Sequence, residues 1–154
     1  MKMRYSVSLY ILLGCLLPFC HEMAVSSNAP AYTHYIYMFA HANGLHFVLN
    51  GIAWAFLWRI ITPARTISAY LAAVAISFLL PAITSDTGVG WSVIIYWFWG
   101  FILAYMPRNA RLRFLALIVI SFFIPGLAAA WHAAMLAIGY LSRKTYDVWQ
   151  RTER

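Results

Sequence analysis

The residues best suited to covalent chemistry are a serine, a histidine and a tyrosine inside long apolar stretches. Ser92 and Tyr96 are four residues apart, so they share one face of a helix. His132 lies in a separate apolar stretch. A serine hydroxyl is a weak nucleophile until a base removes its proton, and histidine is the usual base near neutral pH. This pattern favours a Ser92–His132 pair, with Tyr96 stacked on the imidazole to orient it.

His46 and Asn50, a second polar group, contribute hydrogen-bond donors at the start of another apolar stretch. They are also four residues apart and share a helix face. A tetrahedral oxyanion needs donors, and the Asn50 amide, the His46 ring and the Ser92 backbone N–H are candidates. No acidic residue lies within any apolar stretch, which argues against a Ser-His-Asp triad.

The composition indicates that a membrane surrounds these residues. The chain has 154 residues, of which 64% are hydrophobic and 10% charged, whereas a soluble domain has about 25% charged residues. Such a chain is too apolar and aromatic to be disordered. Its net charge of +7 does not predict nucleic-acid binding, because the basic residues lie between apolar runs instead of clustering on a folded surface.

The gaps between charged residues predict a single domain, residues 1–154, in the form of an all-α bundle of six transmembrane helices. A span needs about 20 apolar residues, with about 17 as the short limit. The predicted helices cover approximately residues 5–21, 45–61, 66–84, 91–106, 110–124 and 126–142. The last two come from one long stretch that Pro125-Gly126, a turn-favouring pair, interrupts. Leu12-Leu13-Gly14-Cys15 resembles a lipoprotein signal, but the apolar run continues beyond it, as a span should.

The basic residues determine the orientation. With six spans, all eleven Lys and Arg residues lie on one side, while Glu22 and Asp86 lie on the other. The positive-inside rule makes the basic side cytoplasmic, and both termini lie there. The candidate site then lies near the outer leaflet, with His132 about two turns into its helix.

The length of the predicted fourth helix places Ser92 below the outer boundary of the membrane. A helix over 91–106 is about 24 Å long, shorter than a hydrocarbon core of about 30 Å. The loop before it, from Ser85 to Gly90, must then dip into the protein, because irregular backbone at that depth needs protein or a water-filled cavity around it.

Three motifs in this order resemble those of the rhomboid intramembrane serine proteases. His-x4-His-x3-Asn at the start of the second helix is matched by His41, His46 and Asn50. Gly-x-Ser on the fourth helix, with a tyrosine four residues later, is matched by Gly90, Ser92 and Tyr96. A histidine on the sixth helix with a glycine seven residues on is matched by His132 and Gly139.

The resemblance implies a serine endopeptidase that cuts membrane-anchored proteins near the outer face. It makes Ser92 the nucleophile and His132 the base, with His46 and Asn50 stabilising the oxyanion and Tyr96 supporting His132. Gly90 and His41 have supporting roles, and no metal or cofactor is implied. The chain departs from the family where glycines are common, with Val93 after the nucleophile and Met135 three residues after His132.

The family's Trp-Arg pair in the first loop is absent as well, and the compact chain resembles the small rhombosortase-like members. The expected partners are a membrane-anchored protein substrate and the lipid bilayer, without nucleic acid. The expected location is a bacterial inner (plasma) membrane.

Other functions remain open. An amine in place of water would make the enzyme a transpeptidase or a sorting-tail processing enzyme. Val93 and Met135 leave open an inactive rhomboid-like binder of membrane helices. His46 and His132 are also candidate axial ligands of a haem. Zinc is disfavoured because it needs three or four ligands and His41 and His46 are poorly spaced to share a face. His21 and His34 are interpreted as solvated loop residues.

Overall fold

The computed structural model describes residues 23–84, 87–123 and 128–152. The predicted first span, Cys15 and His21 lie outside these residues. Within the described ranges the chain forms α-helices, short 3-10 helices and one isolated antiparallel bridge between Val25 and Gly88. The all-α prediction is thus confirmed for the described residues, while the six-span count stays a prediction.

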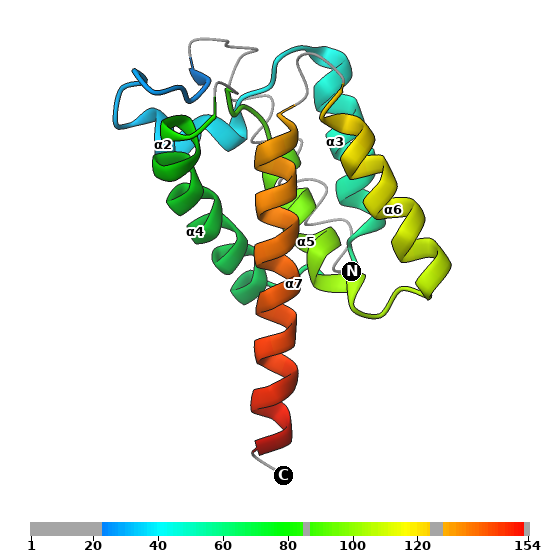
Figure 1. Ribbon diagram of the computed structural model, residues 1–154. Coiled ribbons are helices and arrows are strands. Elements are labelled where there is room, and N and C mark those ends of the chain that lie inside the picture. Colours follow the sequence, from blue (N-terminus) through cyan, green and yellow to red (C-terminus); the bar gives the residue numbers. More distant parts are fainter. Residues whose placement is uncertain (1–22, 85–86, 124–127, 153–154) are drawn as a thin grey trace.

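The helices form a bundle in which α5 is central (Figure 1). α5 packs most extensively on α7 and also contacts α3 and α4. In chain order the elements are α2 (Thr33–Ile36), η2 (Tyr37–Phe39), α3 (Gly44–Phe56), α4 (Pro63–Leu79), η3 (Leu80–Ala82), α5 (Ser92–Leu103), α6 (Arg108–Ser121) and α7 (Ala129–Thr152).

The boundaries of two helices differ from the predicted ones because of proline. α3 ends at Phe56 instead of residue 61, and a turn leads to Thr62, whose backbone is extended before Pro63 begins α4. The residue before a proline is disfavoured in the helical region, so α3 must stop short of it. α5 likewise ends at Leu103 and not at residue 106, because the chain must turn before Pro107, which precedes α6.

The last apolar stretch forms two helices, α6 and α7, with the Pro125-Gly126 pair outside the described residues. α7 continues to Thr152, ten residues beyond the predicted end. Its polar second half has local support, because Arg143 pairs with Asp147 at 2.8 Å, one helical turn apart, and the Tyr105 hydroxyl also donates to Asp147. Hydropathy alone predicted the helix to end near residue 142, because the residues that follow are polar.

Two glycines allow α5 and α7 to approach closely. A methyl group added at Gly100 would lie 2.0 Å from the carbonyl oxygen of Leu136, and one at Gly139 would lie 2.0 Å from that of Trp97. Each glycine thus lies directly against the backbone of the other helix. Val93 and Met135, at positions where the family commonly has glycine, are fully buried in the core instead.

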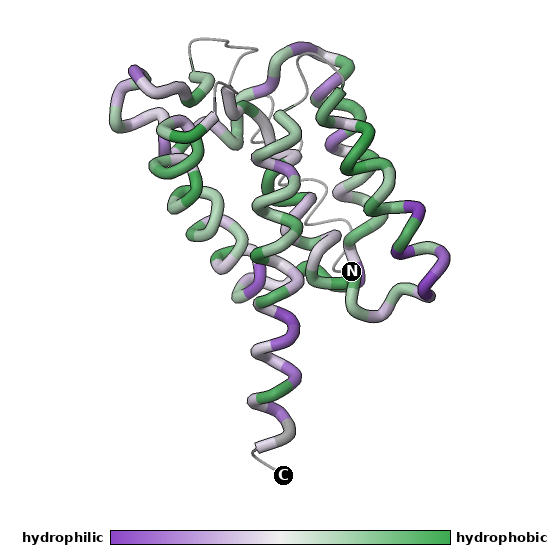
Figure 2. The backbone as a smooth tube through the Cα atoms, viewed as in Figure 1, coloured by the Kyte–Doolittle hydropathy of each residue, from purple (hydrophilic) through white to green (hydrophobic). Residues whose placement is uncertain are grey.

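The outer surface of the bundle is strongly apolar. α4 and η3 together, Pro63–Ala82, have the length and composition to cross a membrane, while α3 and α5 are apolar but shorter. Figure 2 shows hydrophilic residues gathered at the start of α6 and in the second half of α7, whereas α4 is largely hydrophobic. Large apolar side chains are exposed on several helices, among them Leu45, Leu49 and Phe56 of α3, Leu71 and Leu79 of α4, and Leu117 and Val119 of α6.

Candidate active site

The structure brings Ser92 and His132 into direct contact, although they are 40 residues apart in the sequence. His132 Nε2 lies 3.0 Å from Ser92 Oγ. Both side chains are buried, at 8% and 7% exposure. If the hydroxyl donates, Nε2 is the acceptor and the neutral imidazole carries its proton on Nδ1. This is the arrangement in which a histidine removes a proton from a serine.

The position of Ser92 at the start of α5 leaves its hydroxyl available. Other serines of the bundle donate to a carbonyl of the preceding helical turn: Ser121 to Ile118 at 2.6 Å and Ser142 to Ile138 at 2.8 Å. Ser92 is the first residue of α5, so no such helical carbonyl lies behind it. A serine at a helix start often serves as a cap, but α5 begins without a side-chain cap.

Tyr96 holds the imidazole of His132 from one side. The two rings stack with centroids 4.1 Å apart and planes inclined by 14°. Tyr96 lies one turn after Ser92, so one face of α5 contacts both the reactive edge and the flat face of the histidine. His132 lies in the first turn of α7, not two turns into it, because α7 begins only at Ala129. The bond from Nε2 to Ser92 argues against His132 as an axial haem ligand.

The start of α3 fixes both the position and the tautomer of His46. Asn43 caps α3 by accepting a hydrogen bond from the His46 backbone N–H at 2.9 Å. The Ala42 N–H donates to His46 Nδ1 at 3.3 Å, so in the neutral ring Nδ1 is the acceptor and Nε2 carries the proton. Asn43 was not among the predicted site residues, although asparagine before a helix start is a common cap signal.

Gly90 connects His46 to the loop before Ser92. A methyl group at Gly90 would lie 2.5 Å from His46 Cε1, and the backbone φ of 102° is one that other residues rarely adopt. The Gly90 N–H also donates to the Tyr37 carbonyl at 3.0 Å. Glycine is therefore required here both for the backbone and for the close approach of the imidazole.

Asn50 is buried one turn after His46, at 6% exposure. Its Nδ2 has no hydrogen-bond partner among the residues that the structure describes. An unpartnered buried amide is costly, by about 1–3 kcal/mol, and calls for an explanation such as a role in binding or catalysis.

The segment directly before α5 is partly enclosed by protein, because Gly88 and Gly90 are buried whereas Thr87 is exposed. Val25 and Gly88 exchange two backbone hydrogen bonds, of 2.9 and 3.1 Å. Gly88 lies against the ring of Trp131, where an added methyl group would be only 2.8 Å from the indole carbons. Gly88, Gly90 and Trp91 are all buried, so the segment leading to Ser92 is held from two sides.

Two further histidines, His41 and His34, are buried among other side chains. His41 lies before α3, with its ring 5.6 Å from that of His46, and burial, followed by the charge of His46, lowers its pKa to about 4. His34 is not the solvated loop residue that its polar neighbours predicted. It is buried in α2, where Nδ1 lies 3.0 Å from Ser77 Oγ and the ring stacks on Phe78.

No group of three or more metal-ligating side chains occurs among the described residues. No family model matches the chain, and neither a curated protein nor a solved structure matches it.

Proposed function

We propose that this chain is a rhomboid-type intramembrane serine peptidase. In this proposal, six spans form the bundle, and the enzyme cleaves membrane-anchored proteins near the outer face of the membrane. The observation that carries the proposal is the buried Ser92–His132 pair at 3.0 Å, with Tyr96 stacked on the imidazole. A serine whose hydroxyl is not hydrogen-bonded to a helical carbonyl, paired with an oriented histidine, is the minimal machinery for acyl transfer.

The surface chemistry of the bundle supports the membrane placement. Monomeric soluble proteins rarely expose large contiguous apolar patches, whereas this bundle exposes large apolar side chains on α3, α4 and α6. Arg65 of α4 and Arg143 of α7 both lie over the ring of Phe101, at 4.7 and 5.1 Å. Phe101 is nine residues after Ser92 on α5, about 13 Å along the axis, so these two arginines lie at the opposite end of α5 from Ser92.

In the proposed acylation step, Ser92 Oγ attacks the scissile carbonyl carbon while its proton passes to His132 Nε2. The Oγ–C bond forms as the carbonyl π bond opens, which leaves a negative charge on the carbonyl oxygen. When this intermediate collapses, the C–N bond breaks, the amine takes the proton from His132, and an ester of Ser92 remains. General base catalysis of this kind contributes about 10²–10⁴-fold.

In the proposed mechanism, three groups stabilise the oxyanion. The first group is the backbone N–H of Ser92, which lies in the first turn of α5. The N–H groups of a first helical turn lack intrahelical partners and lie at the positive end of the helix dipole. The Nε2–H of His46 and the Nδ2 of Asn50 are the other two donors. The tautomer of His46 and the unpartnered amide of Asn50 support these roles.

In deacylation, His132 takes a proton from water as the water oxygen attacks the ester carbonyl carbon. When this intermediate collapses, the ester C–O bond breaks, the acid product leaves, and Ser92 Oγ takes the proton back from His132. An amine in place of water would give a transpeptidase through the same acyl-enzyme. Water access decides between the two outcomes, so product analysis with and without an added amine nucleophile separates them.

The decisive experiment is labelling of the purified chain, in detergent, by a fluorescent fluorophosphonate. Wild-type protein should be labelled, Ser92→Ala should not, and His132→Ala should react at least about 100-fold more slowly. Ser77→Ala is the matched control, because it removes a second buried serine that also contacts a histidine. Labelling that persists in Ser92→Ala, or is lost in folded Ser77→Ala, would refute the assignment.

A further inference from the structure

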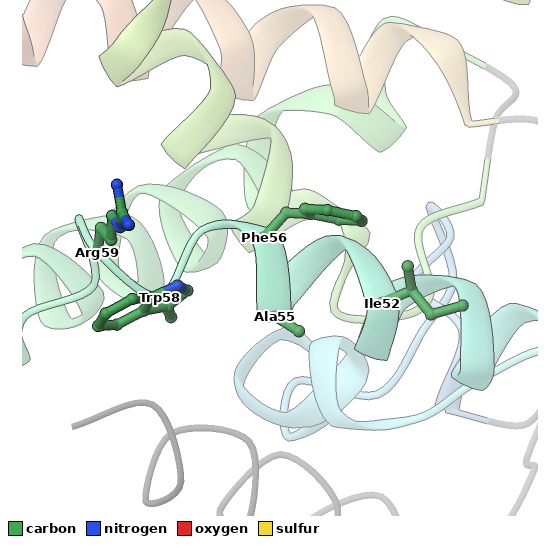
Figure 3. Close-up of a pocket in the computed structure, with 5 residues that line it drawn as sticks. All are labelled: Ile52, Ala55, Phe56, Trp58 and Arg59. Atoms are coloured by element: carbon green, nitrogen blue, oxygen red, sulfur yellow. The ribbon is translucent and has the colours of Figure 1, made fainter. Parts of the chain in front are cut away.

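A cavity lies at the end of α3 that points away from the candidate active site. Its volume is about 560 Å³, within the range of ligand pockets. The lining residues come from the second half of α3 and the turn that follows it: Ile52, Ala55, Phe56, Trp58 and Arg59 (Figure 3). Ile52, Ala55 and Phe56 occupy one stripe of the helix, and Arg59 follows this stripe in the turn. The cavity is thus apolar along its length and carries a cation at one end.

Arg59 is not neutralised by the part of the protein that the structure describes. Its guanidinium lies 5.4 Å from the ring centroid of Trp58, and within the described ranges it has no carboxylate or carbonyl partner. Three other arginines at this end of the bundle are engaged internally. Arg65 donates to the Ile60 carbonyl, Arg111 donates to those of Ala104 and Met106, and Arg143 pairs with Asp147.

We propose that this cavity binds an anionic glycerophospholipid of the cytoplasmic leaflet. The headgroup phosphate would contact Arg59, and one acyl chain would lie along Ile52, Ala55 and Phe56. The inference rests on the membrane placement of the proposed function, which puts Arg59 at the cytoplasmic boundary. Anionic lipids are enriched there, and basic pockets beside transmembrane helices bind their headgroups.

The charge of the lining selects the class of lipid. A zwitterionic headgroup carries a positive charge beside its phosphate, which an acidic side chain would stabilise, and none of the described residues that line the cavity is acidic. An anionic headgroup needs only the cation. Trp58 is suited to the same depth, because indole rings concentrate at the membrane–water interface. The apolar stripe distinguishes this site from a site for free phosphate, which would not require it.

The test is native mass spectrometry of the full chain in a neutral detergent. The protein is mixed with equal amounts of dioleoyl phosphatidylglycerol and dioleoyl phosphatidylcholine, and the bound lipids are counted. We expect wild-type protein to retain phosphatidylglycerol preferentially and Arg59→Gln to lose about tenfold in affinity, the effect of removing one contact to a charged group. Arg108→Gln is the matched control, because Arg108 is exposed at the start of α6 and does not line the cavity.

A second variant tests the apolar part of the site. Ala55→Phe fills the cavity but leaves Arg59 in place, so it should also weaken binding. The proposal would be overturned if wild type and Arg59→Gln retained phosphatidylglycerol equally, or if wild type bound the two lipids equally. It would also be overturned if Ala55→Phe had no effect, or if inorganic phosphate alone competed with the lipid for binding. Ser92→Ala should bind lipid like wild type. If the wild-type protein binds the two lipids equally but is still labelled by the fluorophosphonate, the lipid site is refuted and the peptidase proposal stands.

Discussion

Gly139 provides a quantitative test of the link between helix packing and the Ser92–His132 pair. In Gly139→Ala the new methyl group would lie 2.0 Å from the Trp97 carbonyl oxygen, whereas ordinary contacts begin at 3.4 Å. Backbone cannot yield as a flexible side chain does, so α5 and α7 must separate by about 1.4 Å, the difference between these two distances. Gly139 and His132 are seven residues apart on α7, about 10 Å along its axis, so the separation extends to the site.

A shift of that size would lengthen the 3.0 Å contact of Ser92 with His132 beyond hydrogen-bond distance. A misplacement of about 1 Å costs about 100-fold in rate, and overpacking costs about 1–3 kcal/mol of stability. The assay is the rate of fluorophosphonate labelling at a temperature where circular dichroism shows the variant to be folded. Ala137→Val is the control, because Ala137 is exposed on the same helix.

Gly100→Ala should have the same effect, because its methyl group would meet the Leu136 carbonyl in the reciprocal contact. Once one substitution has separated α5 from α7, the second methyl group displaces the neighbouring backbone by a smaller distance. The double variant should therefore lose less activity than the product of the two single losses. A folded Gly139→Ala protein that labels at the wild-type rate would refute the claim that this contact positions the pair.

Four further predictions concern individual side chains. Asn43→Ala should lower the stability by about 1 kcal/mol in thermal unfolding and slow labelling, while Asn43→Ser, which also caps a helix, should preserve both. Asn50→Leu should lower kcat for a peptide substrate by about 100-fold without lowering the melting temperature, because the Nδ2 group that it removes has no hydrogen-bond partner among the described residues. A lower melting temperature would instead indicate a structural role. Tyr96→Phe keeps the stacked ring and should label like wild type, whereas Tyr96→Leu should label more slowly. Because burial lowers the pKa of His41 from 6.5 to about 4, the stability present above pH 6.5 should decline as the pH falls toward 4, and a pH series of melting temperatures should be flatter for His41→Gln.

The spacing of polar residues in the sequence was informative because helices have a fixed period. Ser92 and Tyr96, four residues apart, were expected on one face, and both contact His132 in the structure. The Ser85–Gly90 loop was expected to be enclosed, and of its described residues Gly88 and Gly90 are buried, Val89 is half-buried and Thr87 is exposed. Both inferences depend only on helix geometry and on the cost of exposing backbone inside a membrane.

Features that depend on tertiary contacts were not accessible in the same way. His34 follows a polar segment, and its burial results from Ser77 and Phe78, more than forty residues later on α4. The tautomer of His46 depends on a backbone N–H at Ala42, for which no side-chain pattern gives a signal. The continuation of α7 to Thr152 depends on contacts of Asp147 with Arg143 and Tyr105, and hydropathy does not report such contacts.

Two buried serine–histidine contacts of equal length occur among the described residues, and they differ in how the serine hydroxyl is held. Ser77 donates its proton to the Val74 carbonyl at 2.6 Å, so in its 3.0 Å contact with His34 the serine oxygen accepts from the imidazole. A hydroxyl held in this way has no proton to give to the histidine. Ser92 differs in its place on the helix, since the first residue of α5 has no helical carbonyl three or four positions behind it. The position of the serine on its helix, more than its distance from a histidine, therefore distinguishes a candidate nucleophile from a serine whose hydrogen bonds are structural.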